Sequence, residues 1–422
     1  MEFTKGFSRK IDEQFTIKIA NDDENDFQRI LDLNVLVHGE PVRDYLSRIY
    51  LEHPRKDQIL WLYIEETDSN KVVSSISLMP LKWKFNDITI PVSEMGFVGT
   101  LEKYRERGFI GELNHLYEQL MFERGYLISV IRGIPYYYRK LGYEFAMPLD
   151  DRMRLSANKI PSTKLNHLHI RKAKLEDIEF VKEMYENYQQ DFFISNKFNI
   201  DLYVFKHFSD EYNEFKSICY IIEYKGAPSA FFTFGMSYDN LAYDIKASHL
   251  NDEQCLKMLQ FIKEITHSKM NEKLDLCARE DSDLGRKILS LGGAHYHTYG
   301  WQVKIPNLKQ FFEKIKVILE KRINNSIFKI LTQNIKISNY KETIELILTN
   351  GKVAAIQLEK GYPKEGTCDL QVPGPMLNKL LIGDRSFEEI NYIVKDAMIR
   401  FEVKDIINTL FPKKSSVPDS YY

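Results

Sequence analysis

Cysteine is scarce in this sequence, and its four copies, Cys219, Cys255, Cys277 and Cys368, lie far apart. None of them belongs to a Cys-x-x-Cys pair. Zinc ribbons and small disulfide scaffolds both need closely spaced cysteines. The spacing therefore argues against a structural zinc site and a disulfide framework, and it favours buried, unreactive thiols in a reducing compartment.

An excess of charge of one sign is also absent. The 58 lysines and arginines nearly balance the 60 aspartates and glutamates, which leaves a formal net charge of −2. Proteins that bind nucleic acid or anionic membranes usually carry a strongly basic surface. We expect neither partner, so any basic site must be local.

Long apolar runs are missing as well. No stretch approaches the roughly 20 apolar residues that a membrane-spanning helix needs, and no apolar run follows the charged residues at the N-terminus. These absences predict a cytoplasmic protein without a membrane partner. A length of 422 residues exceeds one ordinary core, so two or three domains are expected.

Signatures of metal and serine chemistry are not found either. The sequence has no P-loop and no nucleophile elbow. His167 and His169 form a His-x-His pair, as do His295 and His297, but no third ligand accompanies either pair. Since a zinc site needs at least three protein ligands, we expect structural or exposed histidines and no metal.

The most informative stretch covers residues 95–143. It reads as an apolar strand (95–100), a basic turn with a glycine, a long helix (109–124), a second strand (127–131) and a Tyr-rich short helix. Free N–H groups and the positive dipole end make a helix start an anion site. A basic turn before a helix is, however, more often a solvated surface.

The elements before this stretch are two helices and a β-meander. We expect a strand over residues 14–20, followed directly by a helix that Asn21, Asp22 and Asp23 cap. A second helix is expected over residues 42–51. Apolar segments at 59–65, 72–79 and 81–90, the last around an Asn86-Asp87 turn, predict an antiparallel meander.

This order resembles the acetyl-CoA-binding core of the GNAT N-acetyltransferase superfamily. In that family an Arg-x-x-Gly-x-Gly/Ala turn receives the CoA pyrophosphate, and the Eis-like (enhanced intracellular survival) branch carries bulky aliphatic residues after Arg-x-Arg-Gly. Here Ile110 replaces the second small residue, and Gly111 follows it. The resemblance implies an acetyl-CoA site formed by Phe97, Val98, Gly99, Thr100, Arg105, Glu106, Arg107, Gly108, Phe109, Ile110, Gly111, Gly133 and Ile134.

The resemblance also implies the catalytic groups. Tyr138, with Gly142 and Tyr143, matches the Tyr-x-x-x-Gly-Phe/Tyr pattern whose tyrosine faces the thioester sulfur, so it is the expected general acid. Backbone N–H groups near Val98 would form the oxyanion hole. The expected base is the C-terminal carboxylate of Tyr422, and the alternative is Glu94 on the strand before Val98.

The rest of the chain divides into two further parts. Ile19, Asp26, Phe27 and Ile30 recur at a constant offset as Ile170, Asp177, Ile178 and Val181, which suggests a duplicated domain. The second copy has no Arg-x-x-Gly turn, and its helix starts with Asp252 and Glu253, which would repel a pyrophosphate. A late helix, an Asn350-Gly351 hairpin and a Ser386 capping box resemble the sterol-carrier-like domain of Eis-type proteins.

We therefore expect an α+β protein with mixed-sheet GNAT folds. The expected domains are residues 1–156 (catalytic GNAT domain), 165–305 (second GNAT-like domain without acetyl-CoA) and 306–422 (sterol-carrier-like domain whose tail reaches the active site). The expected activity is acetyl transfer from acetyl-CoA to a primary amine of an aminoglycoside, polyamine, peptide or lysine. The Eis-like resemblance implies a homo-oligomer, a hexamer. The alternative is a non-catalytic CoA-binding or scaffolding protein.

Overall fold

The N-terminal third of the chain forms half of a large sheet. The structure, a computed structural model, describes residues 3–211, 216–236, 242–243, 245–266 and 273–418. The elements of this first half are β1 (Ser8–Lys10), β2 (Phe15–Ile19), α1 (Glu24–His38), α2 (Val42–Glu52), η1 (Lys56–Gln58), β3 (Leu60–Glu66), β4 (Val72–Phe85), β5 (Ile88–Thr100), η2 (Glu102–Tyr104), α3 (Phe109–Glu123), β6 (Ile128–Ile131), η3 (Tyr137–Leu141) and β7 (Glu144–Ser156).

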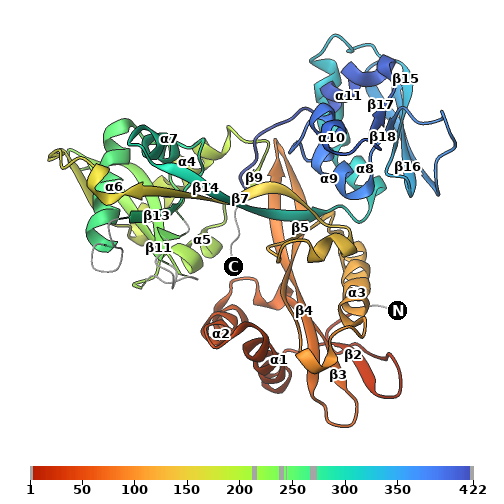
Figure 1. The fold of residues 1–422 in the computed structure, drawn as a ribbon, viewed down its shortest axis with the longest axis horizontal. Coiled ribbons are helices and arrows are strands. Elements are labelled where there is room, and N and C mark those ends of the chain that lie inside the picture. Colours follow the sequence, from red (N-terminus) through yellow and green to blue (C-terminus); the bar gives the residue numbers. More distant parts are fainter. Residues whose placement is uncertain (1–2, 212–215, 237–241, 244, 267–272, 419–422) are drawn as a thin grey trace.

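Helices cover both faces of this half-sheet, with α1 and α2 on one side and α3 on the other (Figure 1). Asp23 caps α1 by accepting from the N–H of Asp26 at 2.7 Å, which confirms the predicted start of that helix. The buried residues Phe27 and Ile30 share a core with Trp61. The opposite core joins Tyr117 of α3 to Phe15 of β2.

The two central strands are longer than the sequence predicts. We expected separate strands on either side of Pro80 and a new one from residue 95, whereas β4 and β5 are continuous around the predicted Asn86–Asp87 turn. Pro80 lies opposite Ser93 inside the ladder, and Pro91 lies opposite Lys82. A proline lacks one N–H but can adopt an extended φ. At Pro80, β4 pairs only with β5, because the ladder with β3 ends at Leu78 and the ladder with β9 begins at Trp83, so one side of the strand is open to accommodate the proline.

The second part of the chain repeats the order of elements of the first. Its elements are η4 (Ala157–Lys159), β8 (Leu168–Lys172), η5 (Leu175–Asp177), α4 (Ile178–Gln189), β9 (Ile194–Asn196), α5 (Ile200–His207), β10 (Ile218–Tyr224), β11 (Ala227–Met236), β12 (Ala242–Tyr243), α6 (Asp252–Thr266), β13 (Lys273–Cys277), α7 (Asp283–Ser290) and β14 (Ala294–Lys304). Strands β12 and β13 pair in parallel, as β5 and β6 do.

Two long strands, β7 and β14, run through both halves. In the described residues fourteen strands form one sheet in the order β1-β2-β3-β4-β5-β6-β14-β7-β13-β12-β11-β10-β8, and β9 pairs with β4. The end of β14 pairs with β6 of the first half, through Val303 and Val130. The end of β7 pairs with β13 of the second half, through Met153 and Leu276. Each half therefore completes its sheet with a strand from the other (Figure 1).

The last part of the chain forms a separate five-stranded sheet with helices, coloured blue in Figure 1. Its elements are α8 (Leu308–Asn324), β15 (Gln333–Ser338), β16 (Glu342–Thr349), β17 (Lys352–Lys360), β18 (Leu370–Gln371), α9 (Gly374–Leu381), α10 (Phe387–Ile393), β19 (Met398–Ile399), η6 (Phe401–Val403) and α11 (Lys404–Leu410). The predicted Asn350-Gly351 hairpin is confirmed, with φ of 50° and 72°, as is the Ser386 capping box. No described helix is long and apolar enough to cross a membrane.

Candidate active site

The site begins where two parallel strands separate. Strands β5 and β6 pair from Val92 and Ile128 to Glu94 and Val130, and the ladder ends there. Beyond Glu94, β5 continues to Thr100 while paired only on its other side, with β4. The backbone groups that β5 directs toward β6 are therefore open to a ligand that enters the wedge.

A β-bulge lies on β5 at the edge of this wedge. Ser77 pairs with Gly96 and Ser75 with Gly99, so Phe97 and Val98 together face one residue of β4. Phe97 has a φ of 48°, which is unusual for a residue with a Cβ. Because a bulge redirects the backbone of its strand, this distortion coincides with the backbone expected to form an oxyanion hole.

The basic turn leads directly into α3. Glu106 and Gly108 both have left-handed φ values, 65° and 80°, and Gly108 caps the helix without a side-chain hydrogen bond. The first helical bond runs from the N–H of Glu112 to the carbonyl of Gly108, so the preceding amides of the turn are available to an anion. A Cβ at Gly108 or Gly111 would meet nothing within 4 Å, which leaves space for a ligand over the turn.

The side chains of this turn diverge. Arg105 and Ile110 line the cleft, and Ile110 also packs against the core around Phe109, so its bulk is partly taken up by the protein interior. Arg107 does not line the cleft. Its guanidinium carbon lies 5.5 Å from the ring centroid of Phe15 and 5.7 Å from that of Tyr104.

Wedge and turn open into one cleft of about 1390 Å³. Drug-sized ligands occupy roughly 300–1,000 Å³, so this cleft can hold a longer ligand or two ligands together. Its walls come from α1, α2, β5, the turn, β6, η3, β7 and β14. The sequence-predicted residues among the lining are Phe97, Val98, Gly99, Thr100, Arg105, Glu106, Gly108, Phe109, Ile110, Gly111, Gly133, Ile134 and Tyr138, together with Glu94.

Tyr138 lies in η3 at the wall of the cleft and is only 6% exposed. Burial raises its pKa above the ordinary value, and Tyr137 and Tyr299 raise it further. The phenol therefore remains protonated at neutral pH, as a proton donor must.

Gly133 provides the space for the Tyr138 ring. A Cβ on Gly133 would lie 2.1 Å from Cε2 of Tyr138, so no other residue fits there without moving the ring. The carbonyl of Gly133 accepts hydrogen bonds from the phenol of Tyr299 at 2.9 Å and from Nε2 of Gln302 at 2.7 Å. Both donors belong to β14, which the sequence analysis had not connected with this site.

Glu94 is the buried carboxylate of the cleft, with 2% exposure. Its Oε1 accepts from Nε of Arg132 at 2.8 Å, whereas its buried Oε2 has no hydrogen-bond partner. Tyr45 lies beside this pair. Burial raises the pKa of Tyr45 to about 12, although the positive charge of Arg132 opposes the rise.

The C-terminal tail approaches this region from the second half of the sheet. The amide of Phe193 donates to the carbonyl of Ser415 at 2.8 Å, and Arg279 donates to the carbonyl of Ser416 at 3.1 Å. Nε1 of Trp301 donates to the carbonyl of Pro418 at 2.9 Å. The guanidinium carbon of Arg132 lies 5.9 Å from the centroid of the Trp301 ring, so Trp301 and Arg132 connect Pro418 to Glu94 through three successive contacts. Tyr422 lies outside the described residues.

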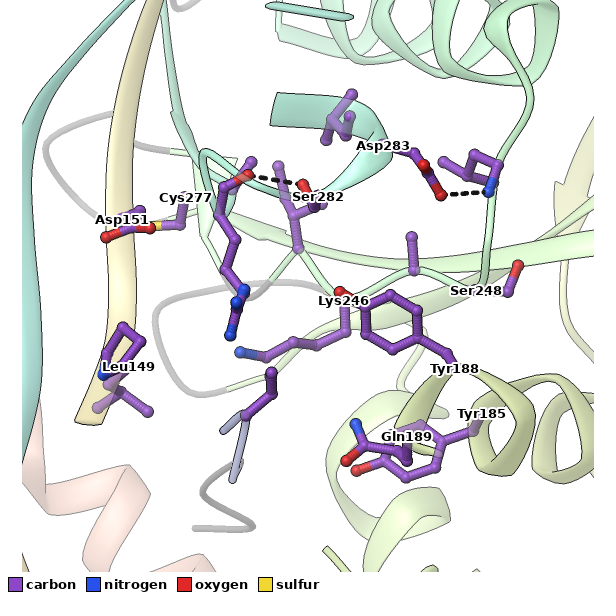
Figure 2. A pocket seen from close by; sticks show the side chains of 18 of the residues that line it. Leu149, Asp151, Tyr185, Tyr188, Gln189, Lys246, Ser248, Cys277, Ser282 and Asp283 are labelled. Atoms are coloured by element: carbon purple, nitrogen blue, oxygen red, sulfur yellow. Dashed lines mark hydrogen bonds between the residues drawn. The ribbon is translucent and has the colours of Figure 1, made fainter. Parts of the chain in front are cut away.

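A second, much smaller pocket lies between β7, α4 and the start of α7 (Figure 2). Its volume is about 60 Å³, and Leu149 lines both this pocket and the cleft. Ser282 and Asp283 close one side, where Ser282 donates to the carbonyl of Arg279 and Asp283 accepts from the amide of Leu250 (Figure 2). Within the part of the chain that is described, no cluster of three potential metal ligands occurs.

Comparison with known proteins agrees with this geometry. Residues 18–146 match the family model described as an acetyltransferase (GNAT) domain. No curated protein sequence matches the chain.

Solved structures resemble the chain over nearly its whole length. A probable N-acyltransferase of unknown function from Enterococcus faecalis V583 is 14% identical, with a TM-score of 0.71 over 96% of this chain and 100% of that one. A GCN5-related N-acetyltransferase from Anabaena variabilis is 15% identical, with a TM-score of 0.67 over 95% and 99%. Eis1 from Mycobacterium abscessus is 11% identical, with a TM-score of 0.61 over 97% and 99%. The protein therefore has the α+β fold of these structures, and its residues 18–146 are similar to a GNAT acetyltransferase domain.

Proposed function

We propose that the protein is an Eis-like N-acetyltransferase that uses acetyl-CoA to acetylate a primary amine. The observation that carries this proposal is the single cleft that contains the strand wedge, the open turn before α3 and the buried phenol of Tyr138. The turn suits a pyrophosphate because left-handed residues, free amides and a helix start come together. The wedge suits the pantetheine arm, which needs partners for its amides.

The chemistry assigned to the chain has three parts. A base removes a proton from the acceptor amine, amides near Val98 stabilise the charge that develops on the carbonyl oxygen, and the phenol of Tyr138 protonates the departing thiolate. The C–N bond forms and the C–S bond breaks, so one proton leaves the amine and one reaches sulfur. The Tyr422 carboxylate is the proposed base, with Glu94 as the alternative; anchoring of the tail at Pro418 supports the first and the unpartnered Oε2 of Glu94 supports the second.

The proposal extends to the architecture. The repeated order of elements supports a second GNAT-like domain between residues 165 and 305. Its small pocket of about 60 Å³ supports the view that this copy does not hold acetyl-CoA. The five-stranded sheet with its helices supports a sterol-carrier-like domain over residues 306–422. The same proposal includes a cytoplasmic location and a homo-oligomeric state, a hexamer. Light scattering after size-exclusion chromatography measures the mass of the particle and so tests the hexamer.

The decisive experiment is an acetyl-transfer assay over a panel of amines. Thiol release from acetyl-CoA and a 42-Da mass increase of one amine, both absent in the Tyr138→Phe variant, are the expected results. A calorimetric titration runs in parallel. Acetyl-CoA binding without turnover of any amine would contradict the catalytic proposal and favour a CoA-binding or scaffolding role.

A further inference from the structure

The β7 and β14 pair presents one face to the cleft, and that face carries an arginine and a histidine opposite each other. Arg152 of β7 is the register partner of His297 of β14. Directly paired residues have Cβ atoms roughly 4.5–5.5 Å apart on the same face of a sheet. Both residues line the cleft, as does Tyr299 two positions further along β14. The neighbouring pair Asp151 and Thr298 belongs to the opposite face.

The charge of Arg152 is not neutralised by the described residues. None of them forms a hydrogen bond or an ion pair with its guanidinium group, and its Nε is buried without a partner. Arg154, two residues away on the same strand, differs because it binds both oxygens of Asp275, at 2.5 and 2.7 Å. A buried N–H without an acceptor is unfavourable, so Arg152 is suited to receive an acceptor from a ligand.

A second unpartnered atom lies in the same cleft. Among the buried side-chain nitrogen and oxygen atoms of the described residues that lack a hydrogen-bond partner, the two from residues lining the cleft are Oε2 of Glu94 and Nε of Arg152. One is an acceptor and the other is a donor. The complementary ligand therefore has an N–H donor at one end and an anionic acceptor at the other.

The separation of these two ends follows from strand geometry. Tyr299 binds Gly133, which contacts the ring of Tyr138. Glu94 is in register with Val130 of β6, which pairs with Val303 of β14. His297, the register partner of Arg152, lies six residues before Val303, which is roughly 20 Å along the strand before the two side chains reach toward each other. The anionic group is then several bonds away from the amine that is acetylated.

We propose that the acceptor is an amine that also carries an anionic group, which binds Arg152 beside His297 while the amine donates to Oε2 of Glu94. This inference rests on the proposed acetyltransferase function and narrows its substrate class. It favours amino carboxylates and peptides over polycations. Arg132 already pairs with the other oxygen of Glu94, so this carboxylate offers less uncompensated negative charge to an aminoglycoside or a polyamine.

The first test compares acceptors that differ only in the anionic group. The pairs are 4-aminobutanoate and 4-aminobutanamide, a dipeptide and its C-terminal amide, and phosphoethanolamine and ethanolamine, with spermidine as the polycation. The expected kcat/KM is about 10-fold or more higher for the anionic member of each preferred pair. The dipeptide and phosphate pairs separate a carboxylate site from a phosphate site. Equal turnover of anionic and neutral members, or a preference for spermidine, would overturn the proposal.

The second test assigns the preference to one side chain. Arg152→Gln should raise KM for the anionic acceptor about 10- to 100-fold, with KM for acetyl-CoA and turnover of the neutral acceptor unchanged. The neutral acceptor also reports that the variant is folded. Arg154→Gln, which removes an arginine from the same strand outside the cleft, is the matched control and should leave every constant unchanged. A rise of KM for acetyl-CoA would instead assign Arg152 to the CoA phosphates and refute the inference.

The two proposals can fail separately. If no amine is acetylated, the acetyltransferase function fails. The anion site is then decided by calorimetric titration of the CoA-saturated protein with the same acceptor pairs. Binding of the anionic member that disappears in Arg152→Gln and persists in Arg154→Gln supports the site, and equal binding of both members rejects it.

Discussion

Tyr299 donates its phenol hydrogen to the carbonyl of Gly133 at 2.9 Å, although 166 residues separate the two along the chain. Gln302 donates to the same oxygen. Two side chains of β14 therefore fix the backbone of Gly133, against which the ring of Tyr138 packs. The expected general acid of the first half is thus positioned by the last strand of the second half.

Removing one of these two hydrogen bonds should loosen that support. For Tyr299→Phe we expect kcat to fall about 3- to 10-fold with KM for acetyl-CoA nearly unchanged, since one hydrogen bond contributes roughly 0.5–1.5 kcal/mol. Steady-state kinetics measure both constants. Tyr296→Phe, on the same strand at an exposed position, is the control. A higher KM at constant kcat would show that Tyr299 binds a substrate and does not position Tyr138.

Tyr138→Phe removes the proposed proton donor itself. We expect kcat to fall about 10²- to 10⁴-fold, which is the usual contribution of a general acid, while acetyl-CoA binding measured by calorimetry stays the same. Because burial raises the pKa of Tyr138, wild-type kcat should not decline between pH 8 and 10 through loss of this proton. An alkaline decline that disappears in Tyr138→Phe would contradict the raised pKa.

Gly133→Ala should have nearly the same effect by another route. The added methyl would overlap the Tyr138 ring, with Cβ only 2.1 Å from Cε2, so the ring must leave its place. The double variant with Tyr138→Phe should then be no slower than Tyr138→Phe alone, because both changes disable one group. Rates that multiply in the double variant would mean that Gly133 acts independently. Gly374→Ala, at an open position outside the cleft, is the matched glycine control.

The identity of the base can be tested at the end of the chain. Deletion of Tyr422 should lower kcat by about 10²-fold or more if its carboxylate is the base, and so should an appended glycine that moves the carboxylate by one residue. Glu94→Gln should then mainly raise KM for the acceptor. Normal kcat in both tail variants, together with a large kcat loss in Glu94→Gln, would assign the base to Glu94.

His53 predicts how stability depends on pH. Burial, assisted by the nearby cations Arg55 and Arg48, lowers the pKa of this 1% exposed histidine to about 3. Below the ordinary value near 6.5 the unfolded chain binds a proton that the folded chain does not, so stability falls as pH falls through this window. Between pH 7 and 5 the loss should be roughly 2 kcal/mol.

Urea unfolding at the two pH values measures this loss. His53→Asn keeps an acceptor for the amide of Arg55, which binds Nδ1 of His53 at 3.1 Å, but it cannot titrate. Between pH 7 and 5 the variant should lose less free energy of unfolding than the wild type. The difference between the two losses is the contribution of His53. An identical loss in both proteins would exclude His53 as the cause.

Local sequence signals predicted much of the architecture. The Asp23 cap, the Asn350-Gly351 turn and the Ser386 capping box depend on residues within a few positions of each other, and the structure confirms all three. The continuity of β4 through Pro80 was missed, because the proline lies where β4 has a partner strand only on the β5 side, and a position open on one side tolerates a missing N–H.

Long-range geometry could not be predicted in the same way. The sequence places Tyr138, Gly133 and the turn at Gly108 near one another, because they share one stretch of chain, and all three line the cleft. Tyr299 and Arg152 also line the cleft. They are brought there by the pairing of β7 with β14 and of β14 with β6, not by proximity in sequence. A strand that completes a distant sheet leaves no periodic signal in its own residues, so only the folded structure reveals it.

The exchange of β7 and β14 has a consequence for synthesis on the ribosome. When the N-terminal third emerges, β6 has an unpaired edge, and the residue that supports Gly133 has not yet been translated. The nascent domain must therefore wait, with an exposed β edge, until the second half has left the exit tunnel. The proposed active site is complete only after β14 has been made, and the exposed edge makes the N-terminal third alone prone to aggregation.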